Sequence, residues 1–216
     1  MTSEETGTGG PSRLRADARR NRDLVVAAAK EVFVELGVDA PLEEVARRAG
    51  VGIATLYRRF PDRQALMRAV ALQVIEEVIG EARAVLADEP DAFRALARYL
   101  HRALDLRIAA VMPILDGRLD LDGEEKLLAA HRELTPLYEM IVRRAHEQGL
   151  RSDVSTGDLG LIVIRLARPL PGAFPRDFDD ELAHRQLDIF LDGLRPGASG
   201  SARDGMTITE VRAARG

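Results

Sequence analysis

The 216-residue chain contains no cysteine and no long apolar run. Without cysteine it can form no disulfide, no thiolate nucleophile and no cysteine-ligated zinc site. No stretch reaches the roughly 18 apolar residues that a membrane span needs, and the polar residues 1–13 lack the apolar core of a secretory signal. We therefore expect a globular protein of the cytoplasm that does not enter a membrane.

The motifs of the common enzyme classes are also missing. The sequence has no G-x-S-x-G nucleophile elbow, no phosphate-binding loop and no dinucleotide-binding fingerprint. No two histidines stand three or four residues apart, as metal ligands on one helical face would; the four are His101, His131, His146 and His184. We therefore predict no enzyme, no metal site and no cofactor.

Charge is unevenly distributed along the chain, whose net charge is −4. Residues 11–70 hold 12 Lys and Arg against 8 Asp and Glu, whereas residues 71–216 hold 19 against 25. A basic head on an acidic body suits a protein whose head binds nucleic acid. The asymmetry is modest and gains weight only together with a DNA-binding motif.

Apolar residues recur at helical spacing along most of the chain, and no segment shows the alternation of a strand. A first helix ends at Gly37, and a second is expected to start at Asp39 or Ala40 with Pro41 in its first turn. Later helices are expected at 61–86, 91–109, 123–148 with a break near Pro136, 155–168 and 178–194. The fold is therefore predicted to be all-α.

The segment 42–60 has the layout of a helix-turn-helix. One face of its first helix is apolar and consists of Val45, Ala46 and Ala49. Gly50 and Gly52 form the turn, because glycine accepts a left-handed conformation at little cost. The second helix starts with small and polar residues and ends in Tyr57–Arg59. This layout presents a helix N-terminus to the major groove of DNA.

Over residues 19–72 the chain resembles the TetR family of bacterial one-component transcriptional regulators. The resemblance rests on residue types at fixed spacing: Phe33 and Gly37, Val45-Ala46, Ala49-Gly50-Val51, Thr55-Leu56-Tyr57, Phe60, Arg63 and Leu66. Beyond residue 80 the chain is similar only in being a helical ligand-binding and dimerisation domain of the right length. The resemblance implies a helix-turn-helix head on such a body.

The resemblance also implies DNA contacts for nine residues. Four stand at the start of the recognition helix, where side chains meet base edges: Gly52, Ile53, Ala54 and Thr55. Five are expected at the phosphate backbone, with Arg58 also able to meet bases: Arg48, Tyr57, Arg58, Arg59 and Arg63. The chain departs from the family pattern at Pro41, where a Thr or Ser cap is common, and this puts the cap's phosphate contact in doubt.

Two features of the head have alternative interpretations. Tyr57 could instead pack between helices. The basic run Arg13–Arg22 could reach the minor groove as an arm, or it could be a solvated helix start.

In the body, the segment Asp158–Ala167 is apolar nearly all round a helix, so we expect it to be buried on more than one face. Arg165 within it would then need an acid, a carbonyl or an anionic ligand as partner, unless its head reaches solvent. Candidate ligand residues are Tyr99, His101, Tyr138 and Arg165. The last helix is apolar on two faces. Together with the helix at 155–168 it predicts a dimer-forming four-helix bundle, which the resemblance also implies. The expected interface residues are Ile162, Leu187, Phe190, Leu191 and Leu194.

These expectations combine into one organisation. A disordered tail (1–12) precedes a DNA-binding head (13–62), a ligand-binding and dimerisation body (63–195) and a second disordered tail (196–216). The predicted function is a homodimeric repressor that binds a palindromic double-stranded DNA operator and is released by a hydrophobic small-molecule inducer. The alternative is a TetR-like chromosome-binding protein controlled by a protein partner or by no ligand.

Overall fold

The computed structural model describes residues 11–111, 124–169 and 175–195, and within these ranges the chain is helical without a strand. The all-α prediction is confirmed. The elements in chain order are α1 (Pro11–Leu36), α2 (Leu42–Ala49), α3 (Ile53–Arg59), α4 (Arg63–Asp88), α5 (Ala92–Asp105), the 3-10 helix η1 (Ile108–Val111), α7 (Glu125–Glu147), α8 (Thr156–Leu166) and α9 (Arg176–Asp192). The described ranges contain no helix that is long and apolar enough to cross a membrane.

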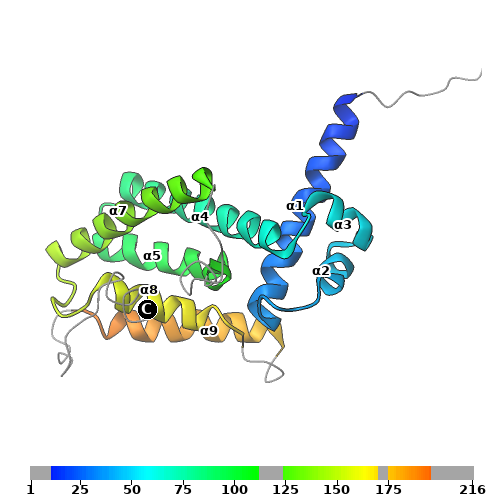
Figure 1. Ribbon diagram of the computed structural model, residues 1–216. Helices are drawn as coiled ribbons and strands as arrows, with labels where there is room; N and C mark the ends of the chain where they lie inside the picture. The colour runs from blue at the N-terminus through cyan, green and yellow to red at the C-terminus, as the bar shows by residue number, and fades with distance from the viewer. Residues whose placement is uncertain (1–10, 112–123, 170–174, 196–216) are drawn as a thin grey trace, which may run out of the picture.

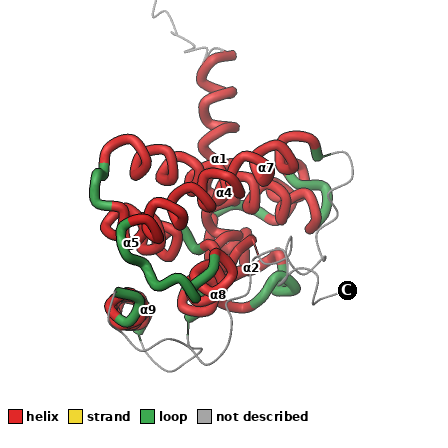
Figure 2. Tube along the Cα trace, turned by 90° about the vertical axis from the view of Figure 1, so that its left-hand side faces the viewer, coloured by secondary structure: helices red, strands yellow, loops and turns green. Residues whose placement is uncertain are grey.

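Helices α1, α2 and α3 form a head at one end, and α4 runs from this head into the body (Figure 1). In the body α4 packs against α5 and α7, while α8 and α9 lie along the opposite side. The view along the molecule places α9 at the edge of the body, beside α5 and α8 (Figure 2). Because α4 also packs against α1, one helix connects the two parts.

Local sequence signals explain most helix ends. Gly37, with a φ of +87°, follows the last residue of α1. Asp62 and Asp91 cap α4 and α5 with their carboxylates, and Ser155 forms a capping box with Asp158 at α8. These caps satisfy backbone amides that would otherwise lack partners.

Three predicted boundaries need correction. Helix α1 begins at Pro11, inside the segment expected to be a disordered tail, and Pro41 precedes α2 as its N-cap residue without a side-chain hydrogen bond. The break expected near Pro136 does not occur: α7 continues through this exposed proline, and Leu137 and Tyr138 after it pack on the core. Residues 1–10, 196–216 and the loop expected at 112–122 lie outside the described residues.

Candidate DNA interface and the body behind it

The turn between α2 and α3 is set by Gly50. Its φ of +67° is left-handed, which glycine adopts without the steric cost of a Cβ. Its amide donates to the carbonyls of Ala46 and Arg47, and the amide of Val51 donates to Ala46 over 3.0 Å. These bonds close α2 and let α3 begin at Ile53.

Helix α3 is held by its inner face and exposes its outer face. Leu56 is fully buried, and Ile53 packs half-buried against the same core. The opposite face carries Ala54, Tyr57 and Arg58, all of which are exposed. This outer face is where the sequence predicted contacts with DNA, although Ile53 also helps to anchor the helix.

The polar side chains of α3 differ in whether they have partners. Arg58 donates from Nη2 to the Thr55 hydroxyl over 2.9 Å, so each side chain positions the other. Tyr57 is 47% exposed, which argues against a packing role between helices. Arg59 is exposed and makes no ion pair or hydrogen bond with any described residue. The Tyr57 hydroxyl and the Arg59 guanidinium can therefore donate to phosphate oxygens.

Arg63, which we expected to bind phosphate at the start of α4, makes two hydrogen bonds within the head. Its Nη1 donates to the carbonyls of Val38 and Ala40 over 2.6 and 2.7 Å, which holds the loop before α2. The Asp62 carboxylate accepts from the amide of Ala65 over 2.7 Å at the same helix end. Arg63 thus has a structural role that the sequence did not reveal, and its phosphate contact stays a prediction.

Arg48 lies between two carboxylates. Its guanidinium pairs with Glu35 of α1 at 2.5 Å and with Glu44 of α2 at 2.8 Å. Glu44 also accepts two hydrogen bonds from Arg47, and the hydrogen bonds from Arg47 and Arg48 lower the pKa of Glu44 to about 2. Arg48 can reach DNA only by exchanging these partners for phosphate, so its predicted contact also stays a prediction.

The basic run Arg13–Arg22 belongs to α1, whose N-terminal part projects beyond α2 and α3 (Figure 1). Arg19 and Arg20 are exposed. The Arg22 guanidinium lies 5.8 Å from the centre of the Phe60 ring, within range of a cation–π contact. Arg22 is therefore partly used to pack the head, while the roles of the rest of the run as an arm or as a solvated helix start both stay open.

Two of the four predicted ligand residues meet inside the body. Tyr99 of α5 and Tyr138 of α7 stack with ring centres 5.5 Å apart. Tyr138 donates from its hydroxyl to the carbonyl of Thr156 over 2.9 Å, and burial raises the pKa of both phenols. His101, the third, bonds instead to residues of α9.

Arg165, the fourth, is exposed on α8, as in the alternative in which its head reaches solvent. Only one side of α8 is covered by the chain itself: Leu159 and Val163 are buried, whereas Leu161 and Ile162 remain partly exposed. An exposed guanidinium keeps its hydration and needs no buried partner.

The burial of three of the five predicted interface residues argues against a place for them in a dimer interface. In the single chain the side chains of Leu187, Leu191 and Leu194 are only 0%, 3% and 5% exposed. Almost none of their surface is left to contact a partner. Two apolar faces on one helix do not reveal which face the chain itself covers. The outward face of α9 instead carries Phe178 and Ile189, 51% and 62% exposed, while Ile162 and Phe190 are partly exposed.

A cluster of ion pairs, which the sequence did not reveal, joins α1 to α9. Arg176 of α9 pairs with Glu31 and Glu35 of α1. Arg107, in the turn after α5, binds both carboxylate oxygens of Asp180 at 2.7 and 2.8 Å and approaches Glu31 at 3.5 Å. The φ of Arg107 is +58°, a conformation that costs a residue with a Cβ about 1 kcal/mol.

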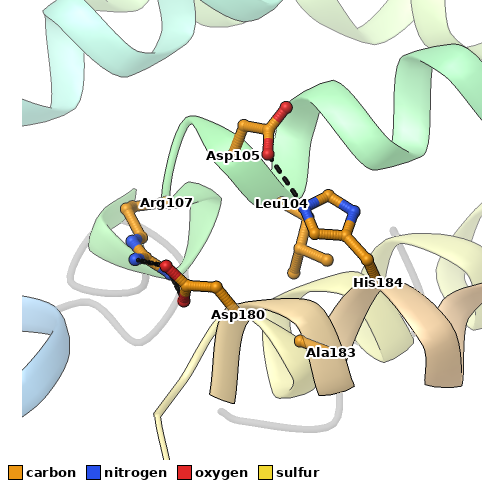
Figure 3. A pocket seen from close by; sticks show the side chains of 6 residues that line it. All are labelled: Leu104, Asp105, Arg107, Asp180, Ala183 and His184. Atoms are coloured by element: carbon orange, nitrogen blue, oxygen red, sulfur yellow. Dashed lines mark hydrogen bonds and ion pairs between the residues drawn. The ribbon is translucent and has the colours of Figure 1, made fainter. Parts of the chain in front are cut away.

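A small pocket opens beside this cluster, between α5 and α9 (Figure 3). It has a volume of about 80 Å³ and is lined by Leu104, Asp105, Arg107, Asp180, Ala183 and His184. The hydrogen bonds from Arg107 hold the pKa of Asp180 below its ordinary value. No sequence pattern indicated this pocket, because its residues come from segments that only the fold brings together.

Comparison with known proteins extends the argument from the head to the whole chain. Residues 25–70 match the family model of bacterial regulatory proteins of the tetR family. The chain is 32% identical to the TetR transcriptional regulator SCO0520 from Streptomyces coelicolor, with 82% of this chain and 99% of that chain covered and a TM-score of 0.53. It is 27% identical to the HTH-type transcriptional repressor BepR from Brucella suis, with 84% of this chain and 82% of the repressor covered.

A further solved structure, LfrR from Mycobacterium smegmatis in complex with proflavine, is 20% identical over 80% of this chain and 96% of that chain, with a TM-score of 0.57. At this identity it supports the fold alone. The relatives with higher identity are regulators of transcription, not enzymes. The chain therefore belongs to the TetR family of transcriptional regulators, and α2 and α3 are its DNA-binding helix-turn-helix.

Proposed function

We propose that the protein is a homodimeric repressor that binds a palindromic DNA operator and releases it when a small-molecule inducer binds the body. The observation that carries this proposal is the exposed surface of α3, on which Tyr57 and Arg59 are both exposed and Arg59 lacks a partner among the described residues. Two heads related by twofold symmetry would enter major grooves about one helical turn, or about 34 Å, apart. The proposed contacts are those of Arg48, Gly52, Ile53, Ala54, Thr55, Tyr57, Arg58, Arg59 and Arg63.

Base readout on this surface would be largely apolar. Ala54 is exposed and can pack on a thymine methyl group, as can the exposed part of Ile53. Thr55 and Arg58 hold each other and would add polar contacts to base edges. Operator preference would thus depend on DNA shape as well as on hydrogen bonds.

The proposed dimer interface lies on the outward faces of α8 and α9. Phe178 and Ile189 are the most exposed large apolar residues of α9, and Ile162 of α8 is partly exposed. Apolar side chains on adjoining helices suit the core of an isologous interface. The head (13–62) and the body (63–195) would then have separate tasks, joined by α4.

The inducer would bind among α4, α5, α7 and α8 and shift α4, which changes the distance between the two heads. Tyr99 and Tyr138 are the proposed contacts, because they are aromatic side chains that meet inside the body, where they could contact a hydrophobic ligand. LfrR, which is alike in fold, is described in complex with proflavine. His101 faces α9 and Arg165 is exposed, so neither is retained as an inducer contact.

A second candidate is a TetR-like chromosome-binding protein controlled by a protein partner or by no ligand. The stack of Tyr99 and Tyr138 favours it, because their rings fill space that a ligand would need and the Tyr138 hydroxyl is already bonded. The pocket between α5 and α9, at about 80 Å³, is far smaller than the roughly 300–1,000 Å³ of small-molecule sites, so it is not proposed as the inducer site.

One experiment separates the candidates. Binding of the purified protein to duplexes tiling its own promoter region is measured by fluorescence anisotropy, with the mass in solution from sedimentation and with a library of hydrophobic compounds. A dimer that binds one palindromic segment and is released by a compound supports the repressor. Binding at many sites without release by any compound supports the chromosome-binding alternative, and a protein without affinity for any duplex contradicts both.

A further inference from the structure

Two histidines, 83 residues apart in the chain, meet head to head between α5 and α9. The Nδ1 atoms of His101 and His184 are 2.7 Å apart. Their ring centres are 5.0 Å apart and the ring planes are inclined by only 12°. Since the centres are much farther apart than the Nδ1 atoms, the rings meet edge to edge in nearly one plane, and each Nδ1 points at the other.

The outer nitrogen of each ring contacts a carboxylate. His101 Nε2 lies 2.9 Å from Asp188 Oδ1, and His184 Nε2 lies 2.9 Å from Asp105 Oδ1 (Figure 3 shows the second contact). An ionised carboxylate can only accept a hydrogen bond, so both Nε2 atoms carry a proton. A hydrogen bond between the Nδ1 atoms requires one more proton. The two rings together therefore hold three protons and one positive charge.

We propose that His101 and His184 bind one shared proton and form a proton-controlled latch between α5 and α9. If the shared proton leaves, two Nδ1 lone pairs face each other at hydrogen-bonding distance. If a fourth proton arrives, two N–H groups and two positive charges face each other. The contact is therefore stable only while the pair holds one shared proton. It opens when that proton is lost at higher pH and when a further proton is gained at lower pH.

The charges around the pair favour this state. On α5, Asp105 bonds to His184 and lies 4.0 Å from Arg102, and on α9 Asp188 bonds to His101. On the nearby turn Arg107 is neutralised by Asp180. The carboxylates of Asp105 and Asp188 thus balance a positive charge on the pair. Helix α8, which packs against both helices, carries Asp158 in its capping box and Arg165 in solvent.

A metal ion explains the arrangement less well. Protein metal sites supply three or four side-chain ligands, and here only two imidazoles converge. No group of three His, Asp or Glu side chains in the described ranges is placed to hold a metal ion.

The proposal fixes the sign of the pH dependence of stability. In the unfolded chain the two histidines bind two protons above neutral pH and four in acid, against three in the native pair. On the alkaline side the native state binds more protons, so stability falls as pH rises. On the acid side the unfolded state binds more, so stability falls as pH falls. The contribution is bell-shaped, and the unfolding constant changes by up to about tenfold per pH unit on each side.

The test is urea unfolding between about pH 5 and pH 9 of the wild type, His101→Gln, His184→Gln and the double variant, with His146→Gln as control. We expect the wild type and the control to share a bell-shaped component that both single variants lose, with no further loss in the double variant. Identical pH profiles in all five proteins would overturn the proposal.

A second measurement needs no variant. Side-chain 15N and 1H resonances of the folded wild type should show a strongly downfield shared proton between the rings of His101 and His184, whose proton-dependent shifts should change together. Two independently titrating imidazoles would contradict the latch. Neither experiment involves DNA, so its outcome is distinguishable from that of the proposed repressor function.

Discussion

The recognition helix α3 and the cluster of ion pairs between α1 and α9 use arginine in opposite ways. On α3, Arg59 is exposed and has no ion pair or hydrogen bond among the described residues, whereas in the body Arg107 and Arg176 are bound by carboxylates. A free cation on a helix surface can bind phosphate, while a paired one mainly holds two elements together. Pairing therefore distinguishes Arg59, which can bind phosphate, from Arg107 and Arg176, which join two elements.

The variant with the largest expected effect disrupts the proposed dimer interface in the body and leaves the head unchanged. Ile189→Arg places a charge in the proposed interface, so sedimentation should report a monomer. Operator affinity should fall by a factor on the order of 10² or more, since the second head no longer binds from the same molecule. Met140→Arg, at a partly exposed apolar position of α7, is the matched control and should remain dimeric.

Leu187→Arg distinguishes a surface from a core. Because Leu187 is fully buried in the single chain, this variant should unfold rather than dissociate. A folded Leu187→Arg monomer, or an Ile189→Arg variant that stays dimeric, would show that the interface lies elsewhere.

The second prediction compares how much two arginines of the head contribute to the stability of the fold. Arg63→Ala removes the donor from the carbonyls of Val38 and Ala40 and should lower the free energy of unfolding by about 2 kcal/mol. Arg59→Ala should leave it unchanged within error, as measured by urea unfolding. Equal effects would mean that the two arginines do not differ in structural role.

These contrasts mark how far the sequence could predict the molecule. The helix-turn-helix was predictable because Gly50, Leu56 and Tyr57 form a local pattern. In such a pattern the spacing of the residues determines which side chains are buried and which are exposed. Leu187 and Ile189 of α9 could not be assigned to core and interface, since both faces of the helix are apolar. Arg107 and Asp180 are 73 residues apart, so no local pattern predicted their pairing.

The third prediction concerns the strained turn in the body. Arg107→Ala loses the pair with Asp180 and keeps a Cβ at a φ of +58°, whereas Arg107→Gly loses the pair and relieves the strain. The glycine variant should be more stable than the alanine variant by about 1 kcal/mol in thermal unfolding. An alanine variant that is equally stable would indicate that the backbone of this turn relaxes.

The smallest effect belongs to the exposed charges of α2. Because the folded pKa of Glu44 is about 2, below its ordinary value of 4.5, its ionised form contributes stability above about pH 4.5 that is lost as pH falls toward 2. Glu44→Gln should remove that part of the acid dependence, and only slightly, since the group is solvent-screened. Unfolding curves across this pH range would measure it; a large effect would mean that Arg48 depends on Glu44 for its place.

The most direct test of the account is the salt dependence of operator binding. The logarithm of affinity is measured against the logarithm of salt concentration for the wild-type dimer and for Arg59→Ala. We predict a steep line for the wild type and, for the variant, a slope reduced by about one unit per head with weaker binding to all sequences alike. An unchanged slope for Arg59→Ala would contradict the assignment of the exposed surface of α3 as the DNA surface.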